Sequence, residues 1–145
     1  MANLFRQLQA RQEKELNEFI RANMFFAFTD EQFQEGLKKL GIEGGAGAVT
    51  RTPAGGYVRT EKAGEFLQIM RQMKAERDAA ITDPTTGRQF IYDMFVAVLA
   101  DTEYQFTGDT ADALELLGYT AEDIDADPAL KDGLQRATEA LTAAQ

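Results

Sequence analysis

The stretch that decides the fold is "FIYDMFVAVLA", residues 90–100, where apolar residues recur at positions i, i+1, i+4 and i+5. This spacing places a broad apolar face along an α-helix and predicts the most buried helix of the chain. The members of that face are Phe90, Ile91, Met94, Phe95, Val98 and Leu99. Asp93 interrupts the run, and helical spacing puts it beside Ala97 and Ala100. We therefore expect Asp93 at the edge of an exposed face rather than as a buried general acid.

Working outward, apolar periodicity predicts helices at about residues 3–23, 29–41 and 61–81 before this stretch, and at about 110–117 and 129–142 after it. The quartet "TDEQ" at residues 29–32 has the pattern of a capping box, and Gly41 and Gly118 follow helix ends. The intervening "MFFAF", residues 24–28, is too apolar for an exposed linker. It fits either a last helical turn or a short buried strand.

A glycine-rich segment, "GIEGGAGAVTRTPAGGYVRT" at residues 41–60, contains two short β-branched runs that flank "PAGG". Such a pattern is typical of a β-hairpin. We therefore predict an α+β fold that is predominantly α, with about six helices around one core and a short β-hairpin near residues 47–60. At 145 residues the chain has the length of a single domain, residues 1–145.

Two segments echo each other: "FTDEQFQEGLKKLGI" (residues 28–42) and "FTGDTADALELLGY" (residues 106–119). Both begin with F-T and end with L-x-x-L-G before an apolar residue. Two independently capped helices would reuse the same residue types at their ends. A duplicated unit is the other interpretation, and the pattern alone leaves both open.

Charge is divided unevenly along the chain. Residues 1–82 are a near-neutral helical half with 12 basic and 11 acidic residues, and they include the glycine-rich hairpin segment at 41–60. Residues 83–145 are an acidic helical half with three basic and 13 acidic residues. A surface of this sign repels polyanions, so we expect no direct binding of nucleic acid. It complements a basic or nucleic-acid-binding protein instead.

The residue types that the chain lacks exclude several kinds of catalytic site and metal site. The chain has no His, Cys, Ser or Trp, which removes thiol, serine and imidazole groups from any catalytic site and takes away the usual zinc ligands. The glycine-rich "GIEGGAGA" lacks the G-K-[ST] of a phosphate-binding loop. We therefore predict no catalytic residue, no metal and no cofactor, although a carboxylate-dependent enzyme stays open as an alternative.

The aspartates of "AEDIDADPALKDG", residues 121–133, resemble the start of a calcium-binding loop. Counting from Asp123, acids occupy positions 1, 3 and 5 of that motif. Pro128 stands at position 6, where the motif needs Gly, and Leu134 at position 12, where it needs Glu. Asp127 as an N-cap followed by Pro128 at the first helical position explains the pattern better. Thr120 and Asp123 are expected to cap the preceding turn.

The strongest candidate site is therefore a surface of acids on folded, amphipathic helices. Carboxylates on a rigid scaffold imitate spaced phosphates and speed association with a basic partner. The candidate partner-binding residues are Asp101, Glu103, Asp109, Asp112, Glu115, Glu122, Asp123 and Asp125. Arg51 and Arg59, one on each predicted strand of the hairpin, form a secondary basic edge.

Neither half of the chain suggests a membrane protein. No apolar run reaches the roughly 18 residues needed to span a bilayer. The first residues, "MANLFRQLQARQEKELNEF", lack the apolar core of a signal peptide, and without cysteine there is no disulfide framework. We therefore expect a cytoplasmic protein with no membrane contact.

Several segments together resemble small acidic proteins carried by phages and conjugative elements of gut bacteria. They are "FFAFTDEQFQEGLKKLG", "GGYVR", "FIYDMFVAVLADTEYQFTGDTADALELLG" and "DPALKDGL". The resemblance implies an accessory protein of a mobile element, working in the bacterial cytoplasm, and transfers no site residue. Proteins of that setting and charge include inhibitors of host defence, among them anti-CRISPR proteins that occupy nucleic-acid grooves. The expected function is thus non-enzymatic binding and inhibition of a host protein; a structural or self-assembling role is the further alternative.

Calcium should not bind to residues 123–134, because two positions of the loop motif are wrong. We expect the thermal midpoint of unfolding to stay constant as calcium is added, apart from weak screening of the net charge of −9. Differential scanning fluorimetry across micromolar calcium measures this, with magnesium as the matched control. A midpoint that rises saturably with calcium alone would show that Asp123, Asp125 and Asp127 bind the ion.

Overall fold

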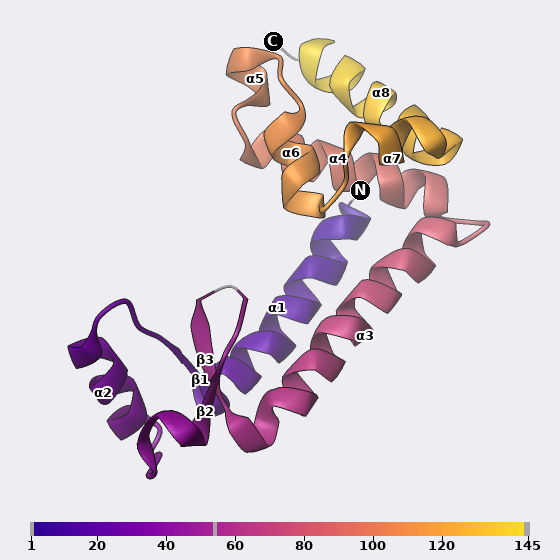
Figure 1. Cartoon of the computed structure of the whole chain (residues 1–145). Helices are drawn as coiled ribbons and strands as arrows, with labels where there is room; N and C mark the ends of the chain where they lie inside the picture. The colour runs from indigo at the N-terminus through magenta and orange to yellow at the C-terminus, as the bar shows by residue number, and fades with distance from the viewer. Residues whose placement is uncertain (1, 54, 144–145) are drawn as a thin grey trace. The chain divides into compact units, whose positions relative to one another are not determined.

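The computed structural model describes residues 2–53 and 55–143 (Figure 1). Within them the chain forms eight α-helices, three strands and two short 3-10 turns, which confirms an α+β fold that is predominantly α. Their bounds are α1 (Leu4–Asn23), β1 (Met24–Phe26), α2 (Asp30–Lys39), η1 (Gly45–Ala48), β2 (Val49–Arg51), β3 (Gly56–Arg59), η2 (Thr60–Lys62), α3 (Ala63–Thr82), α4 (Gly87–Asp101), α5 (Tyr104–Thr107), α6 (Ala111–Leu117), α7 (Ala121–Ala126) and α8 (Pro128–Ala143). The chain divides into two compact units: residues 1–10 with 76–145, and residues 11–75.

Helix α4 is the centre of the first unit. All six residues of its predicted apolar face are buried, and Met94, Phe95 and Leu99 have no exposed surface. Its most extensive contact is with α8, and α5 and α6 also pack on it. The buried cluster adds Leu114 and Leu117 from α6 and Leu130 from α8. The periodicity of residues 90–100 therefore identified the helix around which this unit forms.

Asp93 is buried, with 7% of its surface exposed, so the expectation of an exposed edge was wrong. The reason is the start of α1, which lies against this side of α4. The Leu4 N–H donates to Asp93 Oδ2 at 2.8 Å, and the Asn3 side-chain amide donates to the Asp93 carbonyl at 2.9 Å. Gln89 donates to the other carboxylate oxygen at 2.7 Å. The carboxylate thus caps a helix that is remote in sequence, which is a structural role.

The helix number exceeds the six predicted because two short helices were missed. α4 ends at Asp101, where Thr102 turns to extended backbone, and α5 then forms a single turn that ends at Gly108. α7 is held by the Thr120–Asp123 capping box, in which each residue's side chain accepts from the other's backbone N–H. Asp127 accepts from Ala129 N–H at 3.0 Å at the start of α8, as predicted.

The second unit is built on a three-stranded antiparallel sheet with strand order β1-β3-β2. The predicted hairpin is β2–β3, and "MFF" of residues 24–26 is the short strand β1 rather than a helical turn. Apolar side chains cover both faces. Met24 and Val58 pack with Phe19 and Phe66, and Phe25 packs with residues of α2 such as Leu37.

The buried side chains of the described residues therefore fall into three clusters, one in the first unit and two in the second, rather than the single core expected. A three-stranded sheet covered on both faces creates two separate apolar layers, because its own backbone lies between them.

The two echoing segments end in the same way. At the end of α2, Gly41 N–H donates to Lys38 O and Ile42 N–H donates to Leu37 O. At the end of α6, Gly118 and Tyr119 make the equivalent bonds to Glu115 and Leu114. Both glycines have positive φ, 65° and 78°. This is the Schellman arrangement, which strongly favours Gly after the helix and apolar residues flanking it. Helix termination alone accounts for the shared L-x-x-L-G pattern.

Replacement of Gly133 in α8 tests the close approach of α8 to α4. A Cβ at this position would overlap the side chain of Ile91, which is 1% exposed, and would come within 3.5 Å of the Ile91 backbone. We expect Gly133→Ala to lower the free energy of unfolding by about 1–3 kcal/mol, although Ala is the better helix former. Urea unfolding followed by circular dichroism measures the change.

The matched control is Gly64→Ala in α3, where nothing lies within 4 Å of the new Cβ. This variant should gain about 0.5–1 kcal/mol from helix propensity alone. If both variants were stabilised, the α4–α8 contact would not require glycine.

Candidate functional site

All eight acids of the predicted site belong to the first unit, and all are exposed. They follow one another from the end of α4 to the end of α7. Asp101 is the last residue of α4, Glu103 precedes α5 and Asp109 precedes α6; Asp112 and Glu115 are on α6; Glu122, Asp123 and Asp125 are on α7. The segment from residue 101 to 125 therefore presents carboxylates from three short helices and their connections.

Three of these acids are already engaged within the chain. Asp101 makes a two-pronged ion pair with Arg6, with N–O distances of 2.7 and 2.8 Å. Asp123 belongs to the capping box of α7. Asp109 accepts from Ala111 N–H at 2.9 Å at the start of α6. Their carboxylates stabilise local structure, which leaves less of their hydrogen-bonding capacity for a partner.

The other five acids are Glu103, Asp112, Glu115, Glu122 and Asp125. Across residues 2–53 and 55–143 their carboxylates take part in no hydrogen bond or ion pair. Arg88 and Arg136, which belong to the same unit, both pair with Asp132 instead. We call these five residues the acidic set. Their carboxylates are exposed and unpaired within the described chain.

Two exposed apolar side chains accompany the acidic set. Phe106 on α5 is 91% exposed, and Leu116 on α6 is 66% exposed. Leu116 follows Asp112 by four residues and therefore shares its face of α6. Sequence reasoning missed both residues, because an apolar residue in a short helix is expected to point inward. Both are large apolar side chains exposed within the segment that carries the acidic set.

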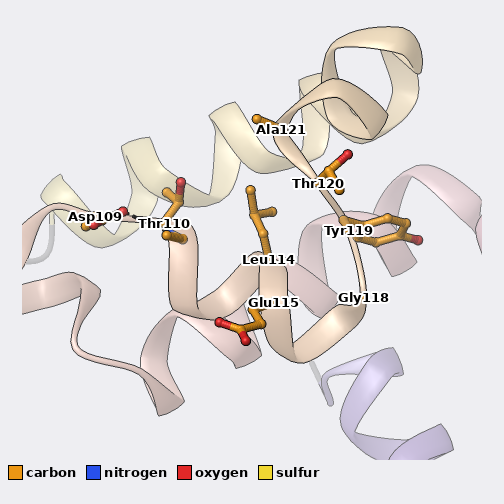
Figure 2. Close-up of a pocket in the computed structure, with 9 residues that line it drawn as sticks. Asp109, Thr110, Leu114, Glu115, Gly118, Tyr119, Thr120 and Ala121 are labelled. Atoms are coloured by element: carbon orange, nitrogen blue, oxygen red, sulfur yellow. Dashed lines mark hydrogen bonds between the residues drawn. The ribbon is translucent and has the colours of Figure 1, made fainter.

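An open depression of about 460 Å³ lies beside α6. Figure 2 shows its lining residues, among them Asp109, Leu114, Glu115 and Tyr119. Two carboxylates in one concavity are what a carboxylate enzyme requires. In Figure 2, however, the Glu115 carboxylate extends to the opposite side of α6 from the Leu114 side chain, and Asp109 caps α6. The two acids do not converge as an acid–base pair.

The two arginines of the predicted basic edge differ in their surroundings. Arg51 on β2 is exposed. Arg59 on β3 is partly buried, and its guanidinium donates to the Leu40 carbonyl at 2.6 Å and to the Ala22 carbonyl at 3.3 Å. Arg59 therefore joins the ends of α1 and α2 to the sheet, where it also meets the negative ends of their dipoles.

Two further observations concern metal binding and membrane crossing. Among the residues that the structure describes, no group of three or more acids is arranged to hold a metal ion. Over the same residues, none of the helices combines the length and apolar character that crossing a bilayer requires.

The ion pair with Arg6 also changes the pKa of Asp101. The hydrogen bond from the Arg6 guanidinium lowers the pKa of Asp101 from its ordinary value, and burial opposes this only in part. The pKa of Asp83 is also lowered, by backbone hydrogen bonds from Thr86 and Thr85. A lowered pKa in the folded state stabilises the fold at pH values above the ordinary pKa, and this contribution is lost as the pH falls through the lowered one. Both groups are exposed, so solvent and salt weaken the effect.

We expect Arg6→Gln to raise the pKa of Asp101 toward its ordinary value and to leave that of Asp83 low, because only Asp101 depends on the guanidinium. Carbon-13 NMR of the carboxyl groups over an acid titration measures both in one experiment. An Asp101 pKa that stays low in the variant would show that a group other than Arg6 stabilises the charged carboxylate.

Comparison with known proteins places most of the chain in one family. A family of unknown function, DUF7659, has a model that matches residues 4–140. No curated protein matches the chain, and no solved structure does. The match includes both units and the complete acidic set. The chain belongs to the DUF7659 family.

Proposed function

We propose that this protein acts by binding another protein through the acidic set on α5–α7 and their connections. The observation that carries the proposal is the combination of five exposed, unpaired carboxylates with the exposed Phe106 and Leu116 in one segment of 23 residues, 103–125. Carboxylates without internal partners keep their full charge for association, and exposed apolar groups provide the area that anchors a complex.

The chemistry of this segment defines the partner class. Ten acids and no basic residue lie between Arg88 and Lys131, so the local field repels nucleic acid and attracts a basic surface. A nucleic-acid-binding protein has such a surface in its groove, and carboxylates held on helices imitate the phosphates it normally takes. The protein thus inhibits its partner by occupying that groove, as expected of an anti-defence accessory protein of a phage or conjugative element in the bacterial cytoplasm.

The side chains that the chain contains favour a binding role over catalysis. The chain has no imidazole, thiol or serine hydroxyl. At the depression beside α6, Asp109 accepts a hydrogen bond at the start of the helix, whereas the Glu115 carboxylate in Figure 2 extends to the side of α6 opposite Leu114. The unpaired acids are spread over three helices instead of gathered in one cavity. Such a distribution suits an extended protein contact.

The test replaces the acidic set by neutral amides: Glu103→Gln, Asp112→Asn, Glu115→Gln, Glu122→Gln and Asp125→Asn. Tagged wild-type protein should capture a basic host protein from nuclease-treated lysate, and the variant should lose about tenfold or more of that capture, because each rim charge contributes to association. Added duplex DNA should displace the captured protein, since both compete for one groove. Quantitative mass spectrometry of the bound fraction measures all three results.

The matched control changes the charge by the same amount elsewhere, at Glu13, Glu18, Glu31, Glu43 and Glu61, all to Gln. These acids are exposed, belong to the second unit and lack ion pairs within the described chain. The control variant should capture as the wild type does. Equal losses of capture in the two variants would show that net charge alone causes the effect. The acidic set would then be rejected as the binding site.

A further inference from the structure

The sheet of the second unit has an open edge along β1. Thr52 N–H donates to the Gly56 carbonyl at 2.8 Å, so the backbone of Gly56 faces β2. Backbone direction alternates along a strand, and therefore Tyr57 turns its N–H and C=O toward β1, where it is paired with Phe25. Phe25 uses its backbone groups in this ladder. The residues on either side of Phe25 in β1 direct theirs away from the sheet.

Phe26 is the clearest case of an unused backbone edge. Its N–H and C=O point outward by this alternation, and no group outside the sheet forms a hydrogen bond with either within residues 2–53 and 55–143. Its ring lies across Gly56 on the neighbouring strand and stays 52% exposed. An unpaired N–H and C=O on an edge strand form a template for one more strand.

A groove of about 640 Å³ runs beside this edge. Its walls come from the last turns of α1, with Ile20 and Arg21, and from α2, with Glu35, Gly36 and Lys39. β1 also lines it, whereas no described residue of β2 or β3 does, so the groove lies on the open side of the sheet. We call it the β1 groove.

Gly36 determines how close α2 comes to the strand. A Cβ at this position would overlap the ring of Phe25, so α2 packs directly on β1 only because residue 36 has no side chain. The Phe25 ring in turn stacks on Tyr57, with 5.4 Å between ring centres. The groove is therefore bounded by a strand and a helix that pack directly on each other.

Charge in the β1 groove is opposite to that of the chain as a whole. Arg21 and Lys39 line it, and within the described residues neither forms an ion pair; Arg21 makes one long hydrogen bond, of 3.5 Å, to the Asn17 carbonyl. Glu35 is the one acid among the lining residues. Two cations without ion pairs, against one acid, leave the groove with net positive charge beside an open strand edge, which suits a peptide that carries an acidic side chain.

We propose that the β1 groove binds an extended peptide segment of a partner protein, which adds to β1 as a fourth strand and directs an Asp or Glu toward Arg21 or Lys39. Backbone hydrogen bonds to Phe26 hold the segment, and the exposed ring of Phe26 contacts its apolar side chains. The same edge of a second copy is itself flanked by its own α1 and α2, whereas a single extended segment carries no such flanking helices. The site lies in the second unit and does not depend on the acidic set.

The test uses peptides selected on the wild-type protein from a random-peptide phage library and then synthesised. Two variants separate backbone pairing from side-chain contact. Phe26→Pro removes the outward N–H, which the sheet does not use, and proline is tolerated on the open side of an edge strand. Phe26→Thr removes the same ring and keeps the N–H. We expect Phe26→Pro to weaken peptide binding about tenfold more than Phe26→Thr, because it deletes a ladder hydrogen bond and leaves the peptide carbonyl unpaired.

Amide exchange of the wild type gives a second measurement that needs no variant. The Phe26 amide should exchange fast in the free protein and at least about tenfold more slowly with peptide bound, as a newly paired edge requires. Selected sequences should alternate apolar residues and contain Asp or Glu. The proposal is overturned if no peptide is enriched, if the Phe26 amide is unaffected, or if both variants bind alike. A dimer that Phe26→Pro dissociates would overturn it in favour of self-association.

Discussion

The close approach of α8 to α4 at Gly133 is the constraint on which the first unit depends. At this point the α8 backbone lies against Ile91, a side chain that is almost completely buried. The contact brings Leu130 and Ala137 of α8 onto the apolar face of α4, and α6 completes the cluster with Leu114 and Leu117. Because α4 takes up most of the apolar surface that the short helices offer, their acids are left facing solvent.

The acidic set is a consequence of this arrangement as much as of composition. α5, α6 and α7 have between four and seven residues each, too short to be stable alone. Each ends or begins in a stabilising local structure, such as Gly108, Gly118 or the Thr120 capping box. Each also contributes apolar side chains to the cluster around α4, which are Tyr104 from α5, Ala113, Leu114 and Leu117 from α6, and Ile124 from α7. These anchors fix the carboxylates in space, which distinguishes this segment from a disordered acidic tail.

The two proposed interaction surfaces use different physics. The acidic set offers side-chain charge and exposed apolar groups, so its binding is sensitive to salt and to the sign of the partner's charge. The β1 groove offers backbone hydrogen bonds, which any extended segment can satisfy, and gains selectivity from Arg21, Lys39 and the ring of Phe26. The two sites lie in different units and carry opposite local charge, so each is suited to a different feature of a partner. The DUF7659 family model matches a stretch of the chain that contains the residues of both sites.

Features that depend on neighbours in sequence could be predicted from the sequence alone. The apolar face of α4, the cap at Asp127, the Thr120–Asp123 pair and the β2–β3 hairpin all involve residues within a few positions of one another, and each was found where the local pattern placed it. What the tertiary structure decided involves partners far apart in the chain. Asp93 is buried because the start of α1 lies on it, and Asp101 is engaged by Arg6; Arg59 is held by carbonyls at the ends of α1 and α2, and β1 exists as a strand because it pairs with β3. A three-residue apolar run has no periodicity of its own, and a lone carboxylate or guanidinium has no local preference for its partner, so only the folded chain brings these groups together.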